Sequence, residues 1–280
     1  MPDGWQWDPT LFRGSAAYYE RGRLPYAPGF AGTLAGALGA TGSDRLLDVG
    51  CGPGIVTLAA APYFAEVTGM DPDADMLAEA ERRAARHGVA NARWVTGRAE
   101  DLPAGLGAFR AVVFAQSFHW TDRERVAAAV RRMLAPSGAF VHISDLKDPP
   151  PVAVPSARPA PPYERIGGLV RRYLGPVRRA GQGTLVGGTP GGEDLVLRRA
   201  GFVHLERHVV PAGAELERTA DDLVAWAFSR SDAAPHLFGD RLADFEGELR
   251  ALLREASPDD CFAEQPPPTE IKIWRPANGG

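Results

Sequence analysis

Residues 45–54 run from a short apolar strand directly into a glycine-rich turn, and this stretch constrains the fold most strongly. Glycines let the backbone turn sharply and let a ligand approach the main chain closely. An apolar helix is expected from about Ile55, and the free N–H groups at its start would face that ligand. The stretch therefore predicts a strand–turn–helix unit that binds a small polar molecule.

The spacing of the glycines narrows the kind of ligand. A P-loop needs Lys followed by Ser or Thr after its last glycine, whereas Ile55 and Val56 follow here. A dinucleotide-binding turn has the pattern G-x-G-x-x-G, whereas this turn has G-x-G-x-G. Asp48, two residues before the first glycine, suits a ligand with an ammonium group better than one with a pyrophosphate. The turn therefore excludes a P-loop and disfavours a dinucleotide.

The composition is that of a soluble globular protein, with 45% hydrophobic and 24% charged residues among 280. That length suits one large domain or two small ones. A net charge of −4 argues against a nucleic-acid partner, because such a partner usually requires a basic face. Two cysteines, Cys51 and Cys261, imply no disulfide framework and favour a reducing compartment.

The N-terminal residues have neither the basic start nor the apolar core of a signal peptide. No apolar run approaches the roughly 20 residues that a membrane helix needs. We therefore expect a cytoplasmic protein without a membrane partner, and the oligomeric state stays open.

Short apolar strands alternate with helical patterns after the glycine turn. This alternation is typical of a parallel sheet flanked by helices. The expected strands are residues 66–70, 92–95, 111–115 and 139–143, and the expected helices are residues 73–87 and 122–134.

Residues 48–54 match the pattern (D/E)-x-G-x-G-x-G at every fixed position. Here the chain resembles the class I methyltransferases, which use S-adenosylmethionine as cofactor. The resemblance covers residues 11–145 well and the C-terminal third in outline. It implies an α/β, Rossmann-like fold: a doubly wound, seven-stranded mixed sheet with its last strand antiparallel. It also implies a single methyltransferase domain over residues 1–280.

Asp71 adds a second position in the cofactor site. An acid at the end of the second strand of a doubly wound sheet bonds the two ribose hydroxyls, although a nicotinamide enzyme would also place an acid there. By the resemblance, Ala99 and Glu100 contact the adenine ring. Arg98 stands where many relatives have an acid, so the resemblance does not carry over the usual contact to the adenine amino group at this position. The other expected cofactor-binding positions are Gly50, Cys51, Gly52, Gly54, Pro72 and Gln116.

Residues 1–30 form an expected cover over the cofactor and substrate. Their Tyr-…-Arg-x-Pro-x-Tyr pattern is similar to the N-terminal segment of many small-molecule methyltransferases. By that resemblance, Tyr19 and Arg23 reach the methionine carboxylate, and Tyr18 and Tyr26 lie beside the substrate. The alternative is an amphipathic helix, residues 10–22, that docks on the sheet by its aromatic side chains.

Two further regions interrupt the expected sheet. Residues 145–192 form a Pro-rich insertion, in which residues 163–179 are expected to be helical, and we interpret it as a lid or substrate wall. The alternative is a linker between two domains. Residues 219–257 form a helical excursion before the last strand, expected at residues 271–274, and its loop 229–238 is a second candidate substrate wall.

His119 is the leading candidate for a general base, because its ordinary pKa lies near neutrality and it follows the fourth strand. The alternative is a histidine that bonds the backbone and orients its loop. Tyr18 and Tyr26 are weaker candidates for catalytic residues. The stretch after that strand lacks the carboxylates that hold magnesium in catechol-type enzymes, so we expect no metal.

The sequence therefore predicts transfer of the methyl group of S-adenosylmethionine to a small molecule, with an aromatic secondary metabolite as the leading kind of acceptor. Methylation of oxygen, of nitrogen or of an electron-rich carbon such as that of an indole stays open. The rivals are an NAD-dependent oxidoreductase and a non-catalytic protein that binds S-adenosylmethionine.

Overall fold

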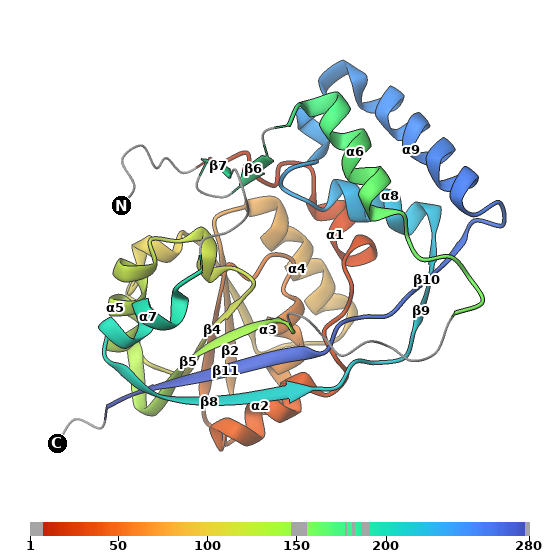
Figure 1. Ribbon diagram of the computed structural model, residues 1–280. Helices are drawn as coiled ribbons and strands as arrows, with labels where there is room; N and C mark the ends of the chain where they lie inside the picture. Colours follow the sequence, from red (N-terminus) through yellow and green to blue (C-terminus); the bar gives the residue numbers. More distant parts are fainter. Residues whose placement is uncertain (1–7, 147–155, 177, 181–182, 186–190, 278–280) are drawn as a thin grey trace.

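The computed structural model describes residues 8–146, 156–176, 178–180, 183–185 and 191–277, built around a seven-stranded sheet (Figure 1). The order across the sheet is β3-β2-β1-β4-β5-β11-β8. The strands are β1 Arg45–Val49, β2 Glu66–Asp71, β3 Ala92–Thr96, β4 Phe109–Ala115, β5 Leu134–Asp145, β8 Phe202–Val210 and β11 Thr269–Pro276. This is the predicted doubly wound arrangement.

Five strands of the sheet are parallel, and β1 lies in the middle of them. It pairs with β2 on one side and with β4 on the other. Four of its five residues are buried, as expected for a strand covered on both faces. The carboxyl ends of these strands therefore meet at one edge of the sheet, where open α/β folds bind their ligands.

The antiparallel edge confirms the prediction for the end of the chain. β11 lies between β5 and β8 and is antiparallel to both. Its side chains alternate between the two faces of the sheet, so that Ile271 and Ile273 join one core cluster and Trp274 joins the other.

Helices cover both faces of the sheet. On one face, α2 (Phe30–Leu38) and α3 (Ile55–Ala60) supply apolar side chains to the core, among them Leu34 and Val56. On the other face, α5 (Arg123–Met133) and α7 (Glu193–Arg199) do so through Val126, Val130 and Leu197. A further helix, α4 (Ala74–Arg86), is capped at its N-terminus by Asp73, whose side chain accepts hydrogen bonds from two backbone N–H groups.

A separate helical unit stands beside the carboxyl ends of the strands (Figure 1). We call it the cap: α1 (Ala16–Gly22), α6 (Tyr163–Leu174), α8 (Ala220–Phe228) and α9 (Leu242–Ala256), with the paired strands β9 (Leu216–Thr219) and β10 (Cys261–Glu264). It has its own core, in which Phe228, Phe238 and Phe245 contact one another. The cap thus joins the N-terminal segment to the 219–257 excursion.

Two predicted helices are shorter than expected. The 10–22 helix begins only at Ala16, and the residues before it form turns. The 163–179 helix ends at Leu174, because Gly175 adopts φ 88°, and residues 178–180 form strand β6, paired with β7 (Gly183–Leu185). Part of the predicted Pro-rich lid, residues 147–155, lies outside the described residues, so the lid stays a prediction.

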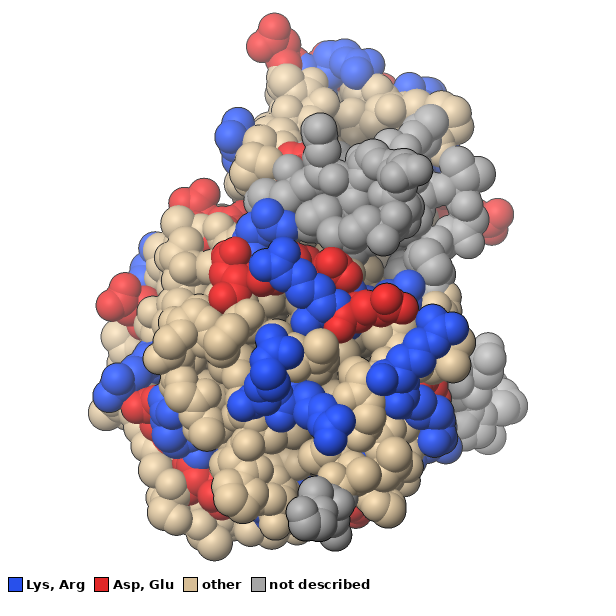
Figure 2. Space-filling model, turned by 90° about the vertical axis from the view of Figure 1, so that its left-hand side faces the viewer, with Lys and Arg blue, Asp and Glu red and all other residues tan. Residues whose placement is uncertain are grey.

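On the molecular face shown in Figure 2, basic and acidic side chains are interspersed with uncharged residues. Within the described ranges, every helix is too short or too polar to cross a membrane.

Candidate active site

The turn between β1 and α3 is shaped by its glycines. Gly50 has φ +69°, and a Cβ atom there would lie 2.6 Å from the Cβ of Ser117, so only glycine lets this turn pack on the end of β4. Gly52 has φ +53°, and a Cβ atom there would meet nothing within 4 Å. Gly54 lines neither of the two cavities described below. A Cβ atom on it would lie 2.7 Å from the Trp94 ring, so this glycine of the motif allows close packing.

Two joined cavities open at the carboxyl ends of the strands, and both are lined by Tyr19, Gly50, Gly52, Gln116 and Trp120. We call them the β2-side cavity and the cap-side cavity. The first is also lined by Asp71, Pro72, Ala99 and Glu100. The second is also lined by Arg23, Tyr26, Asp48, Cys51 and His119. With the exception of Tyr18 and Gly54, the structure brings the predicted site residues together here.

Asp48 is buried at the end of β1 with one carboxylate oxygen in use and one free. Oδ2 accepts hydrogen bonds from Thr57 N at 3.0 Å and from Thr57 Oγ1 at 2.7 Å. Oδ1 is buried without a hydrogen-bond partner among the described residues. Burial raises the Asp48 pKa to about 7, although the bonds from Thr57 oppose that shift. An ammonium group of a ligand would satisfy Oδ1 and favour the charged form.

Asp71 lies where the predicted ribose contact requires an acid. Its Oδ2 accepts from Gly52 N at 2.8 Å, and its Oδ1 accepts from Asp73 N at 2.9 Å. Burial raises the Asp71 pKa to about 6. The two backbone bonds fix the carboxylate, and each oxygen keeps a lone pair that a ligand hydroxyl can use.

Ala99 and Glu100 line the β2-side cavity on a short 3₁₀ turn. Glu100 Oε1 accepts from the backbone N of Asp122 at 2.8 Å, so this carboxylate also anchors the start of α5. Arg98 lies 3.4 Å from Glu100 Oε2 and lines the same cavity. Arg98, which replaces the acid found in many relatives, therefore lies inside the candidate site.

Tyr19 and Arg23 extend from the end of α1 into the cavities. The Arg23 guanidinium lies 5.0 Å from the Tyr19 ring centroid, and its Nη2 donates to Ser229 O at 2.8 Å. Its Nε is buried without a hydrogen-bond partner among the described residues, as is Asp48 Oδ1 on the same cavity. The pair of unsatisfied groups, one cationic and one anionic, fits a zwitterionic amino-acid moiety.

Tyr18 does not lie beside the cavities, which corrects the prediction for this residue. Its ring packs 5.1 Å from Phe228 within the cap core. Because successive helical residues point about 100° apart, Tyr19 faces the cavities while Tyr18 faces the cap. Tyr18 thus docks the helix as an aromatic side chain, but on the cap and not, as the alternative for this helix had it, on the sheet.

Tyr26, His119 and Trp120 form part of the cap-side cavity. His119 lies on a 3₁₀ turn after β4, with its ring 4.5 Å from the Trp120 ring. Burial raises the pKa of Tyr26 well above its ordinary value, and the nearby carboxylates of Asp145 and Asp48 add to that shift. Tyr26 is therefore a neutral hydrogen-bonding group rather than a ready base.

Asp145 and three cap residues were not among the predicted site residues. Asp145, at the end of β5, lines the cap-side cavity and accepts from Gln116 Nε2 at 2.9 Å. Burial raises its pKa. The sequence could have indicated Asp145 by its place at the end of the fifth strand, because side chains there lie at the ligand-binding edge of the sheet.

The cap contributes Trp226, Arg230 and Asp232 to the same cavity. Arg230 binds Asp232 through both its Nε (2.9 Å) and Nη2 (2.8 Å), and its guanidinium lies 4.6 Å from the Trp226 ring centroid. Arg230 and Asp232 fall in the predicted loop 229–238. The sequence did not indicate Trp226 as a site residue, because a tryptophan on a helix usually belongs to the hydrophobic core.

The described residues contain no cluster of three or more His, Cys, Asp or Glu side chains that could hold a metal ion. The predicted absence of a metal stays a prediction.

Comparison with known proteins agrees with this geometry. Residues 46–138 match the family described as "Methyltransferase domain". An uncharacterized methyltransferase of Mycobacterium tuberculosis is 34% identical over 142 residues, which are 50% of this chain and 55% of that protein. A probable S-adenosylmethionine-dependent methyltransferase of Saccharomyces cerevisiae is 34% identical over 97 residues, or 34% of this chain and 33% of that protein. The chain thus spans about half the length of the mycobacterial relative.

The fold also has a counterpart among solved structures. The crystal structure of the YcgJ protein from Bacillus subtilis superposes with a TM-score of 0.51 at 19% identity, covering 89% of this chain and 98% of that one. Residues 46–138 therefore match a methyltransferase domain, and they lie within a sheet whose fold is similar to that of YcgJ.

Proposed function

We propose that the whole chain is an enzyme that transfers the methyl group of S-adenosylmethionine to a small, aromatic acceptor. The observation that carries this proposal is the pair of unsatisfied buried groups, Asp48 Oδ1 and Arg23 Nε, on one cavity. A zwitterionic methionine moiety satisfies both. When bound, the cofactor supplies a sulfonium-activated methyl group, and the chain's residues hold it and the acceptor in line.

On the cofactor side, Asp48 binds the ammonium group, and Arg23 with Tyr19 binds the carboxylate. Asp71 accepts hydrogen bonds from the ribose hydroxyls, beside the open space at Gly52. Pro72, Ala99 and Glu100 line the adenine end of the same cavity. Gly50 and Gln116 line both cavities, and Cys51 lines the cap-side cavity. These residues therefore lie between the adenine end and the methionine end of the proposed site.

On the acceptor side, the rings of Trp120, Trp226 and Tyr26 support an aromatic acceptor. Holding the nucleophile in line behind the methyl group can supply roughly 7–11 kcal/mol in favourable cases. A hydroxyl or amine nucleophile must also lose a proton, and a positioned base contributes about 10²–10⁴-fold. His119 and Asp145 line this cavity, and we assign the proton-accepting role to one of them.

The decisive experiment incubates the protein with methyl-labelled S-adenosylmethionine and a panel of phenolic, indolic and amino acceptors. Mass spectrometry and NMR locate the transferred methyl group. We expect label in an aromatic acceptor, with His119→Ala or Asp145→Asn slowing transfer to a hydroxyl or amine. Melting temperatures measured with S-adenosylhomocysteine and with NAD(H) separate the rivals, since stabilisation by NAD(H) alone would indicate an oxidoreductase.

A further inference from the structure

The cofactor-contacting helix α1 and the acceptor-side helix α8 are packed backbone against backbone. A Cβ atom added to Gly22, the last residue of α1, would lie 2.4 Å from the carbonyl carbon of Ala225, closer than real side chains come. At the other end of α1, Ser15 Oγ donates to Phe228 O at 2.8 Å in a buried hydrogen bond. The two helices therefore fit together at both ends of α1.

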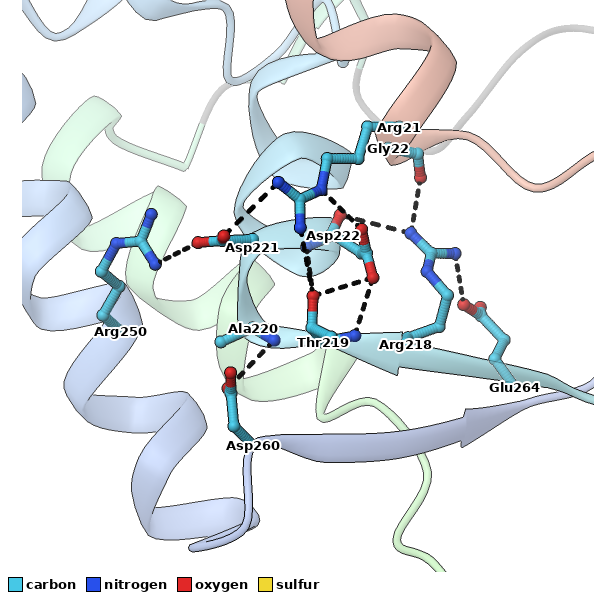
Figure 3. Close-up of polar contacts among 10 residues, drawn as sticks. All are labelled: Arg21, Gly22, Arg218, Thr219, Ala220, Asp221, Asp222, Arg250, Asp260 and Glu264. Atoms are coloured by element: carbon cyan, nitrogen blue, oxygen red, sulfur yellow. Dashed lines mark hydrogen bonds and ion pairs between the residues drawn. The ribbon is translucent and has the colours of Figure 1, made fainter.

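A buried arginine fixes the same junction (Figure 3). Arg218, at 4% exposure, donates through Nη1 to Glu264 Oε2 at 2.9 Å. Its Nη2 donates to the carbonyl oxygens of Gly22 at 2.9 Å and of Asp222 at 3.2 Å. Because one guanidinium binds the end of α1 and the first turn of α8, neither can shift without losing a charge-assisted hydrogen bond.

An outer layer of ion pairs surrounds this junction. Arg21 contacts Asp222 at 2.6 Å and Asp221 at 3.4 Å, and Arg250 contacts Asp221 at 2.6 Å (Figure 3). The side chains of Arg21 and Asp221 are about half exposed, at 53% and 49%. Exposed pairs contribute little, so the buried contacts of Gly22 and Arg218 dominate the junction.

The junction lies directly beside both halves of the proposed site. Arg23 follows Gly22 in the chain, lines the cap-side cavity and donates to Ser229 O at 2.8 Å. Ser229 in turn follows α8 and precedes Arg230, while Trp226 lies one residue after Ala225. If α1 moved so that Arg23 turned toward a ligand, Trp226 and Arg230 would therefore move with it.

We infer that Arg218 and Gly22 are positioning residues that make the cofactor-binding end of α1 and the acceptor wall of α8 one rigid unit, so that cofactor binding orders the acceptor wall. This inference rests on the proposed function, because it requires Tyr19 and Arg23 to bind the cofactor. It predicts that the acceptor binds best after the cofactor, since bound cofactor stabilises the wall through this junction.

The test uses hydrogen exchange of the full chain with and without S-adenosylhomocysteine. In the wild type, saturating ligand should slow exchange of the α8 amides, residues 220–228, by about threefold or more. Gly22→Ala should weaken ligand binding about tenfold or more, since a displaced Arg23 loses a charge-assisted bond. At saturation, the α8 response should be absent. Gly36→Ala, at an exposed position of α2 where a Cβ meets nothing within 4 Å, is the matched control and should behave as wild type.

Arg218→Met combined with Glu264→Gln provides a second variant, which leaves neither charge buried alone. It should lose the α8 response as Gly22→Ala does, and it carries the test if Gly22→Ala does not fold. A wild-type α8 that does not respond to bound ligand, or a folded variant that keeps the full response, would overturn the coupling. Failure of the wild type to bind S-adenosylhomocysteine at all would instead overturn the proposed function.

Discussion

The sheet and the cap divide the proposed site between them in different ways. The sheet supplies turn residues with fixed backbone geometry, such as Gly50 and Asp71, to the β2-side cavity. The cap supplies long side chains, such as Trp226 and Arg230, to the cap-side cavity. Sheet turns can recognise an invariant ligand through the main chain, whereas helix side chains can change without altering the fold. In the proposed function, the ribose and adenine of the cofactor therefore lie where the chain is most constrained, and the acceptor where it is least constrained.

The largest expected effects test whether the two cores are independent. Phe140 in the sheet core and Phe245 in the cap core are both fully buried, so each substitution to alanine should cost about 3–5 kcal/mol. Phe245→Ala should speed hydrogen exchange in α6, α8 and α9 while β1 and β4 stay protected. Phe140→Ala should lower the melting temperature of the whole chain. Equal acceleration in both regions by either variant would show that sheet and cap unfold as one unit.

Asp48→Asn tests the sheet's part in cofactor binding. Removing the charge that pairs with the ammonium group should weaken S-adenosylhomocysteine binding about 100-fold, or ~2.7 kcal/mol, as measured by calorimetry. The same change should raise the melting temperature of the free protein at pH 8, because it removes a buried charge whose Oδ1 lacks a partner among the described residues. Asp75→Asn, exposed on α4, is the control and should change neither quantity. Unaltered binding by Asp48→Asn would remove Asp48 from the site.

The pH dependence of cofactor binding sharpens the same point. Burial raises the Asp48 pKa to about 7 in the free protein, and only the ionised carboxylate attracts an ammonium group. The dissociation constant of S-adenosylhomocysteine should therefore rise by up to about tenfold between pH 7 and pH 6.

The stability of the free protein should change in the opposite direction. Since the folded Asp48 pKa lies above the unfolded value, the folded state holds the proton more tightly between pH 4 and 7, and this group's contribution falls as pH rises through that window. Urea denaturation at several pH values provides the check, with Asp48→Asn as the variant that should flatten the trend. For the binding prediction above, a dissociation constant of S-adenosylhomocysteine that does not change with pH would contradict the ammonium contact assigned to Asp48.

The smallest effect is expected at the cap surface. Arg250→Ala removes an ion pair with Asp221 in which the side chains are 36% and 49% exposed. Because solvent screens such pairs, the free energy of unfolding should fall by less than about 1 kcal/mol, and less still in high salt. A loss above about 2 kcal/mol in urea denaturation would show that the outer ion pairs, and not Arg218 alone, hold the cap together.

The sequence by itself determined the sheet and which residues lie at its turns. Local signals were sufficient there: parallel strands such as β1 and β4 are apolar runs, and the motif from Asp48 to Gly54 encodes a backbone geometry in its own glycines. Asp71 could be identified because its place at the end of a strand fixes where its carboxylate lies. The missed helix α2 contains two glycines, Gly32 and Gly36, which weaken the local signal although Leu34 and Leu38 are fully packed.

Only the tertiary structure decided how the cap is assembled. Tyr18 and Tyr19 are adjacent in sequence, yet one packs in the cap core and the other lines the cavities. Gly22, Arg218 and Glu264 show no local pattern, because their contacts join segments about 46 to 196 residues apart. Such contacts depend on which helix packs beside which, and periodicity within one segment carries no information about its partner. The glycine turn therefore defines the cofactor site, and the packing of α1 on α8 defines what surrounds it.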